Sequence, residues 1–199
     1  MGGWQHGAMI EIRAAVSADA DAIAAAHIDG WRMGYRHLLP DEYLDAPSFA
    51  QQRIDRWRMW TWAQGLRGSQ VYVPVLDGEV VGFGHCGAER VEPTCDQSGT
   101  DAAAEVSEER GEVYGFYLHP SAWGTGAAAP LMERCHQHLV AAGYRSAVLW
   151  VLKDNPRARG FYEKAGWQPT GRELMFTGPQ SVSMPAFELP EVEYAKIFH

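Results

Sequence analysis

The sequence predicts a single α/β domain with a mixed, mostly antiparallel sheet of six or seven strands, flanked by helices. Three observations predict this fold class. Short β-rich runs alternate with segments whose apolar residues follow helical spacing. The dipeptide Asp77-Gly78, a turn signal, joins two of the β-rich runs. Further along, a strand, a helix and a second strand follow one another, as in a parallel crossover connection.

Length and composition fit one soluble domain. The chain has 199 residues, of which 46% are hydrophobic and 21% charged. We expect residues 1–8 to form an N-terminal extension and residues 9–199 to form the domain. No apolar run approaches the roughly 20 residues that span a bilayer, and the first residues do not resemble a secretory signal.

Charge and cysteine content exclude several classes of partner. The net charge of −8 and the pI near 5.4 oppose binding to nucleic acid, which requires a basic surface. Three widely spaced cysteines argue against a disulfide framework or a zinc site and favour a reducing cytoplasm. His136 and His138 lie two apart on a predicted helix and point to different faces, so we expect no metal.

The first half of the chain predicts helices between short strands. Residues 9–13 alternate like a strand, and Ser17 is placed to cap the helix that follows. A second helix begins near Ser48 and ends near Gly65. The Asp-Gly turn joins strands over 71–76 and 79–89.

The acidic stretch from Val91 to Gly111 is poor in large apolar residues and predicts a long loop. The second half alternates strands and helices. The expected elements are a strand over 112–119, a helix over 128–142, a strand over 146–153, a helix after Asn155 that ends before Gly166, and strands over 168–175 and 192–198. The helix over 128–142 places Met132, Cys135, Leu139 and Ala142 on one face.

A glycine-rich turn, Trp123-Gly124-Thr125-Gly126-Ala127-Ala128, lies between a strand and a helix. Small residues let the backbone approach a bulky anion, and the free amides of the first helical turn point at it. Pro130 is tolerated only in the first turn of a helix, which fixes where the helix begins. The turn also matches a dinucleotide fingerprint, but no acidic residue follows about 20 positions later, so a dinucleotide is disfavoured.

These residues resemble the GCN5-related N-acetyltransferases. The signature Gln/Arg-x-x-Gly-x-Gly/Ala falls on residues 123–128, where Gly126 and Ala128 match and Trp123 replaces the usual Gln or Arg. The segment from Asn155 to Trp167 is similar to the second signature, Asn-x-x-Ala-x-x-Phe-Tyr-x-x-x-Gly-Phe. Residues 31–40 also look like an N-terminal arm common in this family. The resemblance extends from Ile10 to Phe198.

The resemblance implies a site for acetyl-CoA, the expected co-substrate. It implies that backbone groups of residues 116–118 pair with the pantetheine arm, and that the sheet splays between the strands ending at His119 and starting near Ser146. The acyl thioester would then lie near Asn155 and Tyr162. The expected cofactor-binding residues are Phe116, Tyr117, Leu118, Trp123, Gly124, Thr125, Gly126, Ala127, Ala128, Asn155, Arg157, Phe161 and Tyr162.

Two residues are candidates for catalysis. An alkyl ammonium must lose a proton before it attacks, at a cost of roughly 4 to 5 kcal/mol at pH 7, and a carboxylate accepts that proton. Glu112, at the start of a strand expected to face the cleft, is the first candidate, with His119 as a second. Tyr162 is the candidate acid for the leaving thiolate, and packing beside Phe161 is its alternative role. Asn155 is first of all the N-cap of its helix.

The expected reaction moves an acetyl group from acetyl-CoA to a primary amine of a small molecule or peptide, by direct attack in a ternary complex. The alternative is a non-catalytic acyl-CoA-binding or regulatory module on the same fold. A homodimer is compatible with the sequence. The aromatic residues of the N-terminal helices, Trp31, Tyr35, Trp57, Trp60 and Trp62, are expected mostly in the core, with some available to line an acceptor pocket.

Overall fold

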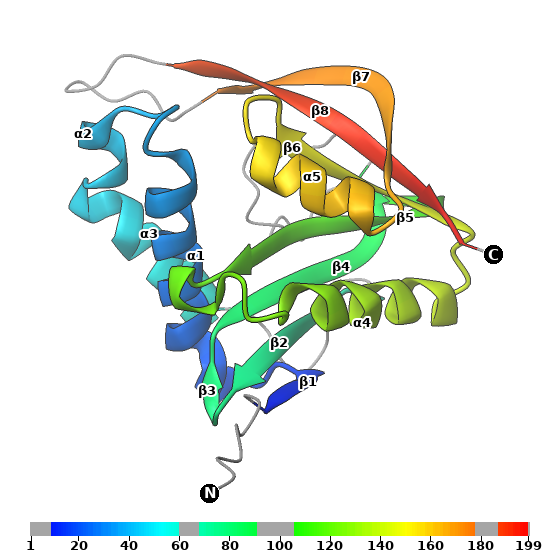
Figure 1. The fold of residues 1–199 in the computed structure, drawn as a ribbon, viewed down its shortest axis with the longest axis horizontal. Helices are drawn as coiled ribbons and strands as arrows, with labels where there is room; N and C mark the ends of the chain where they lie inside the picture. Colours follow the sequence, from blue (N-terminus) through cyan, green and yellow to red (C-terminus); the bar gives the residue numbers. More distant parts are fainter. Residues whose placement is uncertain (1–8, 60–67, 91–105, 178–186, 199) are drawn as a thin grey trace, which may run out of the picture.

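The computed structural model describes residues 9–59, 68–90, 106–177 and 187–198, which fold into one sheet with helices on both faces (Figure 1). The strands are β1 (Ile10–Ala14), β2 (Gln70–Leu76), β3 (Glu79–Val80), β4 (Gly82–Arg90), β5 (Val106–Leu118), β6 (Ser146–Leu152), β7 (Gln168–Thr177) and β8 (Glu188–Ile197). The helices are α1 (Ala20–Tyr35), α2 (Asp41–Leu44), α3 (Pro47–Met59), α4 (Ala128–Ala141) and α5 (Pro156–Lys164), with 3-10 turns η1 (Ser17–Asp19) and η3 (Pro120–Ala122).

The sheet has eight strands in the order β1-β2-β4-β5-β6-β8-β7, with the two-residue β3 paired to β2. The predicted α/β class is therefore confirmed, with one strand more than the upper number expected. Every neighbouring pair is antiparallel except β5 and β6, which are parallel and are connected through α4. This pair is the crossover connection that the sequence predicts.

The predicted Asp-Gly hairpin is confirmed. Asp77 has φ 51° and Gly78 has φ 92°, so both central residues of the turn lie in the left-handed region. Positive φ at both positions is the requirement of a type I′ turn, whose twist matches that of the flanking strands. The second run is divided into β3 and β4 at Val81, and β4 returns to pair with β2.

The prediction that the whole acidic stretch forms a loop is partly wrong. Residues 106–111 belong to β5, where Val106 and Ser107 pair with Arg90 and Glu89 of β4, and Gly111 pairs with Ala88. Arg110 Nε donates a hydrogen bond to Glu89 at 2.8 Å, a cross-strand charge pair. Residues 91–105 of that stretch lie outside the described residues, as do the N-terminal extension 1–8, the expected helix end near Gly65, and Trp60 and Trp62.

The prediction that Ser17 caps the first helix is also wrong. Ser17 begins η1, and the helix start is held by Asp19, whose carboxylate accepts a hydrogen bond from the backbone amide of Val16 at 2.9 Å. The same carboxylate accepts two hydrogen bonds from Arg13, at 2.7 and 2.8 Å. These bonds hold the pKa of Asp19 below its ordinary value, Arg13 contributing most. An ionised acceptor forms stronger bonds than a serine hydroxyl.

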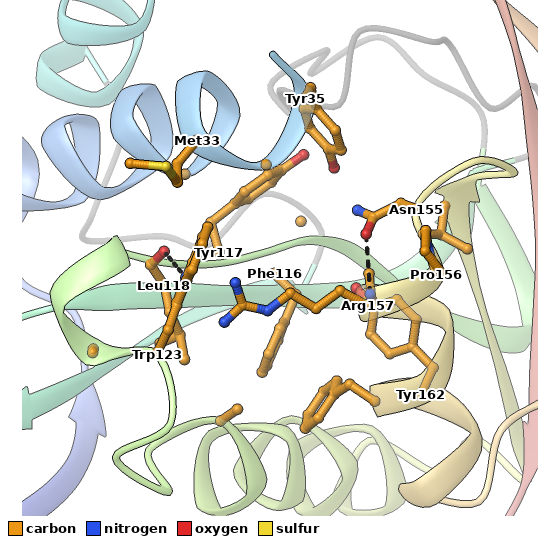
Figure 2. A pocket seen from close by; sticks show the side chains of 18 of the residues that line it. Met33, Tyr35, Phe116, Tyr117, Leu118, Trp123, Asn155, Pro156, Arg157 and Tyr162 are labelled. Atoms are coloured by element: carbon orange, nitrogen blue, oxygen red, sulfur yellow. Dashed lines mark hydrogen bonds between the residues drawn. The ribbon is translucent and has the colours of Figure 1, made fainter. Parts of the chain in front are cut away.

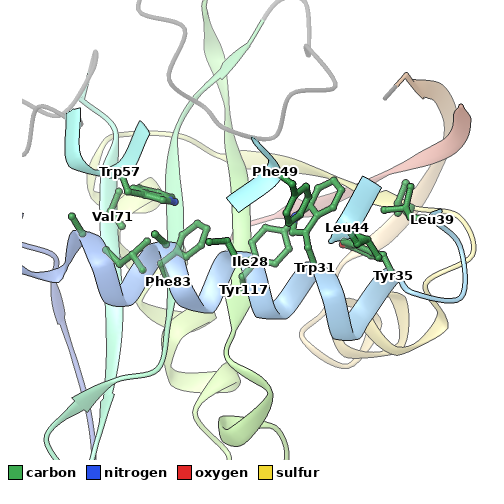
Figure 3. Close-up of a cluster of buried hydrophobic side chains, with 14 of the residues drawn as sticks. Ile28, Trp31, Tyr35, Leu39, Leu44, Phe49, Trp57, Val71, Phe83 and Tyr117 are labelled. Carbon is green, nitrogen blue, oxygen red and sulfur yellow. The ribbon is translucent and has the colours of Figure 1, made fainter. Parts of the chain in front are cut away.

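Two hydrophobic clusters lie on the two faces of the sheet. On β2, Val71 and Val73 pack with α1, α2 and α3, whereas Tyr72 between them packs with α4. Trp31 and Trp57 are buried in the first cluster, as expected (Figure 3). In α4 the predicted inner face is confirmed for Met132, Cys135 and Leu139, but Ala142 ends the helix and is exposed. No helix in the described ranges is long and apolar enough to cross a membrane.

The parallel pairing of β5 and β6 is short, and this opens the sheet. It extends from Gly111 opposite Ala147 to Val113 opposite Leu149 and then stops. A register shift on the other edge of β5 leaves Tyr114 as an extra residue, because Val113 and Gly115 face consecutive residues of β4. Such a bulge bends the strand that carries it. Beyond Val113 the two strands diverge, which is the splay implied by the family resemblance.

Candidate functional site

A pocket of about 690 Å³ occupies the opening between β5 and β6. Its walls come from the end of α1, the second half of β5, the turn after η3, β6, and the first half of α5 (Figure 2). The structure brings most of the predicted site residues into this lining: Phe116, Tyr117, Leu118, Trp123, Gly124, Gly126, Ala128, Asn155, Arg157, Phe161 and Tyr162. Thr125 and Ala127 belong to the same turn but do not line the pocket.

The glycine-rich turn leads directly into α4. Gly124 has φ 80° and Gly126 has φ 92°, and neither has a described atom within 4 Å of where a Cβ would stand. These positions therefore require glycine for their backbone conformation, and the space beside them is open. The Thr125 hydroxyl donates to the Ala122 carbonyl at 2.8 Å, which fixes the turn. The amides at the start of α4 have no intrahelical acceptor, so they suit an anion.

The second half of β5 presents a free backbone edge to the pocket. The amide of His119 donates to the carbonyl of Val81 at 2.8 Å, on the β4 side. Because successive residues of a strand point their polar backbone groups to alternate sides, those of Phe116 and Leu118 face away from β4. β6 has already diverged there. The Leu118 carbonyl accepts the indole N–H of Trp123 at 3.0 Å. The remaining groups at this edge suit an extended ligand that binds as a strand does.

Tyr162 lies on the inner face of α5 and lines the pocket (Figure 2). Its ring packs against Phe116, Phe161 and Tyr194. Within the described part of the chain, no group forms a hydrogen bond with its hydroxyl. Burial raises the pKa of this phenol above its ordinary value, so it stays protonated at neutral pH and keeps a proton to donate.

Asn155 joins the start of α5 to the end of α1. Its side-chain oxygen accepts the Ala158 amide at 3.1 Å, which confirms the predicted N-cap. Its side chain lies on the pocket together with Tyr35 of α1 and Tyr117 of β5. Burial raises the pKa of Tyr35 to about 12, and the polar groups of Tyr117 and Asn155 oppose the rise. Figure 2 shows Tyr35, Tyr117 and Asn155 around the same part of the pocket.

Replacement of the cap should weaken the protein modestly. We expect Asn155→Ala to lower the free energy of unfolding by about 1 kcal/mol, since an amide at the start of α5 loses its acceptor. Urea denaturation followed by circular dichroism measures this difference. Asn155→Asp is the control, because it keeps a side-chain oxygen at the capping position. Equal midpoints for Asn155→Ala and the unchanged protein would show that the cap does not stabilise α5.

Glu112 is not where the catalytic hypothesis required it. It is buried, with 1% of its surface exposed, and it is not among the residues that line the pocket. Its carboxylate accepts hydrogen bonds from the amide and the guanidinium of Arg90, the amide bond at 2.9 Å. The expectation that it faces the cleft is therefore wrong. A strand alternates its side chains, and the Tyr114 bulge after Glu112 changes which residues face the pocket.

The second candidate base, His119, also lies outside the pocket lining. Its Nδ1 is 2.7 Å from the Ser121 hydroxyl, and its Nε2 is 3.4 Å from a carboxylate oxygen of Asp29. These contacts hold it at the turn between β5 and η3. These contacts account for a histidine at this turn without a catalytic role.

Several lining residues were not singled out as site residues from the sequence. Met33 and His37 come from the end of α1 and the segment after it, Trp150 from β6, and Lys164 from the end of α5. Tyr35, expected as either core or acceptor pocket, is both buried and part of the lining. The structure places Trp150 half-buried in a mostly buried strand, and the sequence carried no signal for this exposure.

The charge of the pocket is distinctive. Among the described residues that line it, none is an aspartate or glutamate, while Arg157 and Lys164 are cationic. The whole chain carries a net charge of −8, so this pocket differs in sign from the molecule as a whole. Such a field favours an anionic ligand. No three His, Cys, Asp or Glu residues in the described ranges form a group that would hold a metal ion.

Comparison with known proteins identifies the family. The model of the Acetyltransferase (GNAT) family matches residues 31–167. An N-acetyltransferase of Bacillus subtilis, YuaI, is 30% identical over 149 residues, covering 74% of this chain and 75% of the relative. A probable N-acetyltransferase of Mycobacterium tuberculosis, Rv2775, is 25% identical over 182 residues, covering 88% and 90%. The chain belongs to the GNAT family and is an N-acetyltransferase.

Solved structures share the fold. YncA from Salmonella typhimurium, a putative acetyltransferase solved with acetyl-CoA, superposes with a TM-score of 0.64 at 18% identity, covering 95% of this chain and 94% of that one. The PaiA N-acetyltransferase from Thermoplasma acidophilum, solved with coenzyme A, gives a TM-score of 0.63 at 14% identity, covering 96% and 99%. At these identities the likeness concerns the fold.

Proposed function

We propose that the pocket between β5 and β6 binds acetyl-CoA and transfers its acetyl group to a primary amine of a small molecule or peptide, by direct attack in a ternary complex. The observation that carries this proposal is the position of three features around one opening. The turn at Gly124 and Gly126, the free edge of β5, and the hydroxyl of Tyr162 all face it.

The residues present fit acetyl-CoA. The open amides before α4 suit the diphosphate of the cofactor, since they concentrate donors and a positive helix dipole at one point. The edge at Phe116 and Leu118 suits the amides of the pantetheine arm, which is extended and carries donors and acceptors. The arm would then run from the turn toward α5, where Tyr162 and Asn155 lie.

Tyr162 is proposed as the acid of the reaction. The amine nitrogen forms a bond to the thioester carbon, the carbon–sulfur bond breaks, and sulfur leaves with the electron pair and accepts a proton from Tyr162. The nitrogen loses one proton to solvent as the amide forms, and the Tyr162 phenolate regains one from solvent, so the products are the amide and the free thiol. A thiolate resembling that of cysteine, with pKa about 8.5, gains from a nearby proton donor. The Tyr162 hydroxyl has no other described hydrogen-bond partner and remains protonated, so it is available to donate to sulfur.

The amine reacts in its neutral form. No described residue of the lining is a carboxylate, and the cations Arg157 and Lys164 disfavour a further positive charge. The pocket therefore favours the uncharged amine, which is the nucleophile. Met33, Tyr35 and Trp150 line the pocket away from the glycine turn and favour an amine carried on an apolar or aromatic body.

The cytoplasm is the proposed compartment. Cys86 and Cys135 are both free and buried. Free thiols persist in a reducing environment, where acetyl-CoA is consumed by soluble enzymes.

Release of free thiol from acetyl-CoA tests the proposal. The purified protein is mixed with acetyl-CoA and a panel of amines that spans arylalkylamines, polyamines, amino acids and peptide N-termini. We expect release above the rate without protein for at least one amine, with the acetylated amine identified by mass spectrometry. Tight acetyl-CoA binding without release for the whole panel would favour the alternative, a non-catalytic acyl-CoA-binding module.

A further inference from the structure

The acceptor nitrogen loses one proton as the amide forms, and neither residue expected from the sequence to take that proton lines the pocket. Glu112 is buried in its pair with Arg90. His119 is held at its turn by Ser121 and Asp29. The proton must therefore pass to another group that lines the pocket, or directly to water.

Few groups in the described lining can accept a proton at neutral pH. Besides His37, the titratable side chains there are Tyr35, Tyr114, Tyr117, Tyr162, Arg157 and Lys164. Burial raises the pKa of all four tyrosines, so their phenols stay protonated. Arginine and lysine side chains already carry their proton at neutral pH. Histidine is the residue type that ordinarily exchanges a proton in this range, and His37 is the one histidine among the described lining residues.

His37 lies where the segment after α1 approaches the loop before α5. Its Nε2 is 3.5 Å from the backbone carbonyl oxygen of Asp154, the residue that precedes the cap Asn155. Tyr35, two residues before His37, lies with Asn155 in the same part of the pocket (Figure 2). The side chain of His37 is therefore placed at the end of the pocket where the acceptor amine is proposed to bind.

The contact with Asp154 distinguishes the two ring nitrogens of His37. A carbonyl oxygen only accepts hydrogen bonds, so the contact favours the tautomer with hydrogen on Nε2 and a lone pair on Nδ1. The side chain of His37 is exposed, so the ring exchanges protons with bulk water. A neutral imidazole of this kind can take a proton from a nitrogen in the pocket and release it to solvent.

The charged residues that share this region come from the segment of His37, the loop before α5, and α5 itself: Arg36, Asp154, Arg157 and Lys164. Arg36 is paired with Asp41 at 2.8 Å and with Asp45 at 2.7 Å. Replacement of His37 leaves all of these charges in place. A change in the pH dependence of the reaction on that replacement would therefore report the imidazole.

We propose that Nδ1 of His37 accepts the proton that the acceptor nitrogen loses during acetyl transfer, and that His37 then passes this proton to water. The inference rests on the proposed function, since it assigns the proton acceptor of the same reaction. The nitrogen–hydrogen bond breaks as a bond between Nδ1 and hydrogen forms, and the electron pair stays on the nitrogen of the amide. Tyr162 delivers a separate proton to sulfur, so each of the two proton transfers has its own residue.

The pH dependence of acetyl transfer tests the inference. The substrate is a fluorinated, weakly basic form of an amine that the release assay identifies. Such an amine is already neutral, so its own ionisation does not shape the profile. We expect kcat/KM of the unchanged protein to fall as the pH decreases from about 8 to about 5, because a protonated imidazole cannot accept a proton. His37→Ala should lower kcat/KM at pH 8 by about 10²-fold and remove this limb, with the affinity for acetyl-CoA unchanged.

Two further variants and a rescue experiment separate proton transfer from a structural role. His37→Gln keeps an N–H that can donate to the Asp154 carbonyl but takes up no proton, so it should behave as His37→Ala does. Imidazole added to His37→Ala should restore formation of the acetylated amine, after the rate without protein is subtracted. His119→Ala is the matched control: it removes a histidine that does not line the pocket, and it should keep both the rate and the acidic limb.

Several results would overturn the proposal. One is a full rate with an intact acidic limb in His37→Ala, and another is a loss of rate that keeps the limb and that imidazole does not reverse. A His37→Gln protein that kept the limb would show that the ring acts only through its contact with Asp154. Loss of the limb in His119→Ala would assign the proton to His119 instead. Failure of the unchanged protein to acetylate any amine would refute the proposed function itself, which is a separate result.

Discussion

Tyr162→Phe should lower turnover by about 10²- to 10⁴-fold, the range of effects seen when a positioned acid is lost. The substitution removes one oxygen from a ring that is otherwise held by Phe116, Phe161 and Tyr194, so the fold should be unaffected. Affinity for acetyl-CoA should change little, since the binding contacts come from the glycine turn and the edge of β5. Steady-state kinetics with a responsive amine, together with calorimetric titration, separates the two quantities.

Tyr72→Phe is the matched control for that experiment. The Tyr72 hydroxyl is 3.3 Å from Nδ1 of His138, and the residue does not line the pocket. Its loss should leave turnover within a small factor of the unchanged protein. If Tyr162→Phe behaved in the same way as Tyr72→Phe, the hydroxyl of Tyr162 would have no role as an acid, and the ring would serve packing alone.

Glu112→Ala should destabilise the protein by about 3 to 5 kcal/mol, the cost of leaving one buried charge without its partner. Arg90 is 9% exposed and Glu112 1%, so water cannot replace the missing carboxylate. Burial lowers the pKa of the Arg90 guanidinium, and Glu112 raises it, so that the net direction is upward. Urea denaturation measures the loss. Replacing both partners, in Arg90→Met with Glu112→Leu, should recover part of the stability.

A pH profile distinguishes this structural role from catalysis. For Glu112→Gln, turnover per folded molecule should keep the acidic limb of the unchanged protein. A general base must be deprotonated to act, so removing it would abolish a limb that falls as the pH decreases through the pKa of the base. If a fully folded Glu112→Gln protein had lost both activity and this limb, Glu112 would act as the general base, and the structural role would be contradicted.

The local geometry of the glycine-rich turn and of the start of α5 could be predicted from sequence because it depends on local chemistry. The positive φ of Gly124 and Gly126, the proline in the first turn of α4, and the cap at Asn155 all follow from what single residues permit in the backbone. The order of strands and helices in the second half of the chain follows from periodicity for the same reason. These features require no knowledge of tertiary contacts.

The errors share a different cause. Residues 106–111 looked like a loop because their stabilising partners, such as Glu89, lie more than fifteen residues away in sequence. Glu112 was expected to face the cleft because its partner Arg90 belongs to the neighbouring strand, and because the extra residue at Tyr114 is visible only in the pairing register. The cation–π contact of Arg157 with Trp123 was likewise not predicted, because the two residues belong to two signatures about 30 residues apart, and the sequence does not show that they meet.

The central claim is that acetyl transfer takes place in the opening between β5 and β6. A crystal structure of the complex with coenzyme A measures it most directly. We expect the diphosphate within hydrogen-bond distance of the amides of residues 124–128, and the sulfur within about 4 Å of the Tyr162 hydroxyl, the reach of a weak hydrogen bond to sulfur. A cofactor bound elsewhere, or a sulfur far from Tyr162 with the diphosphate correctly placed, would contradict the claim.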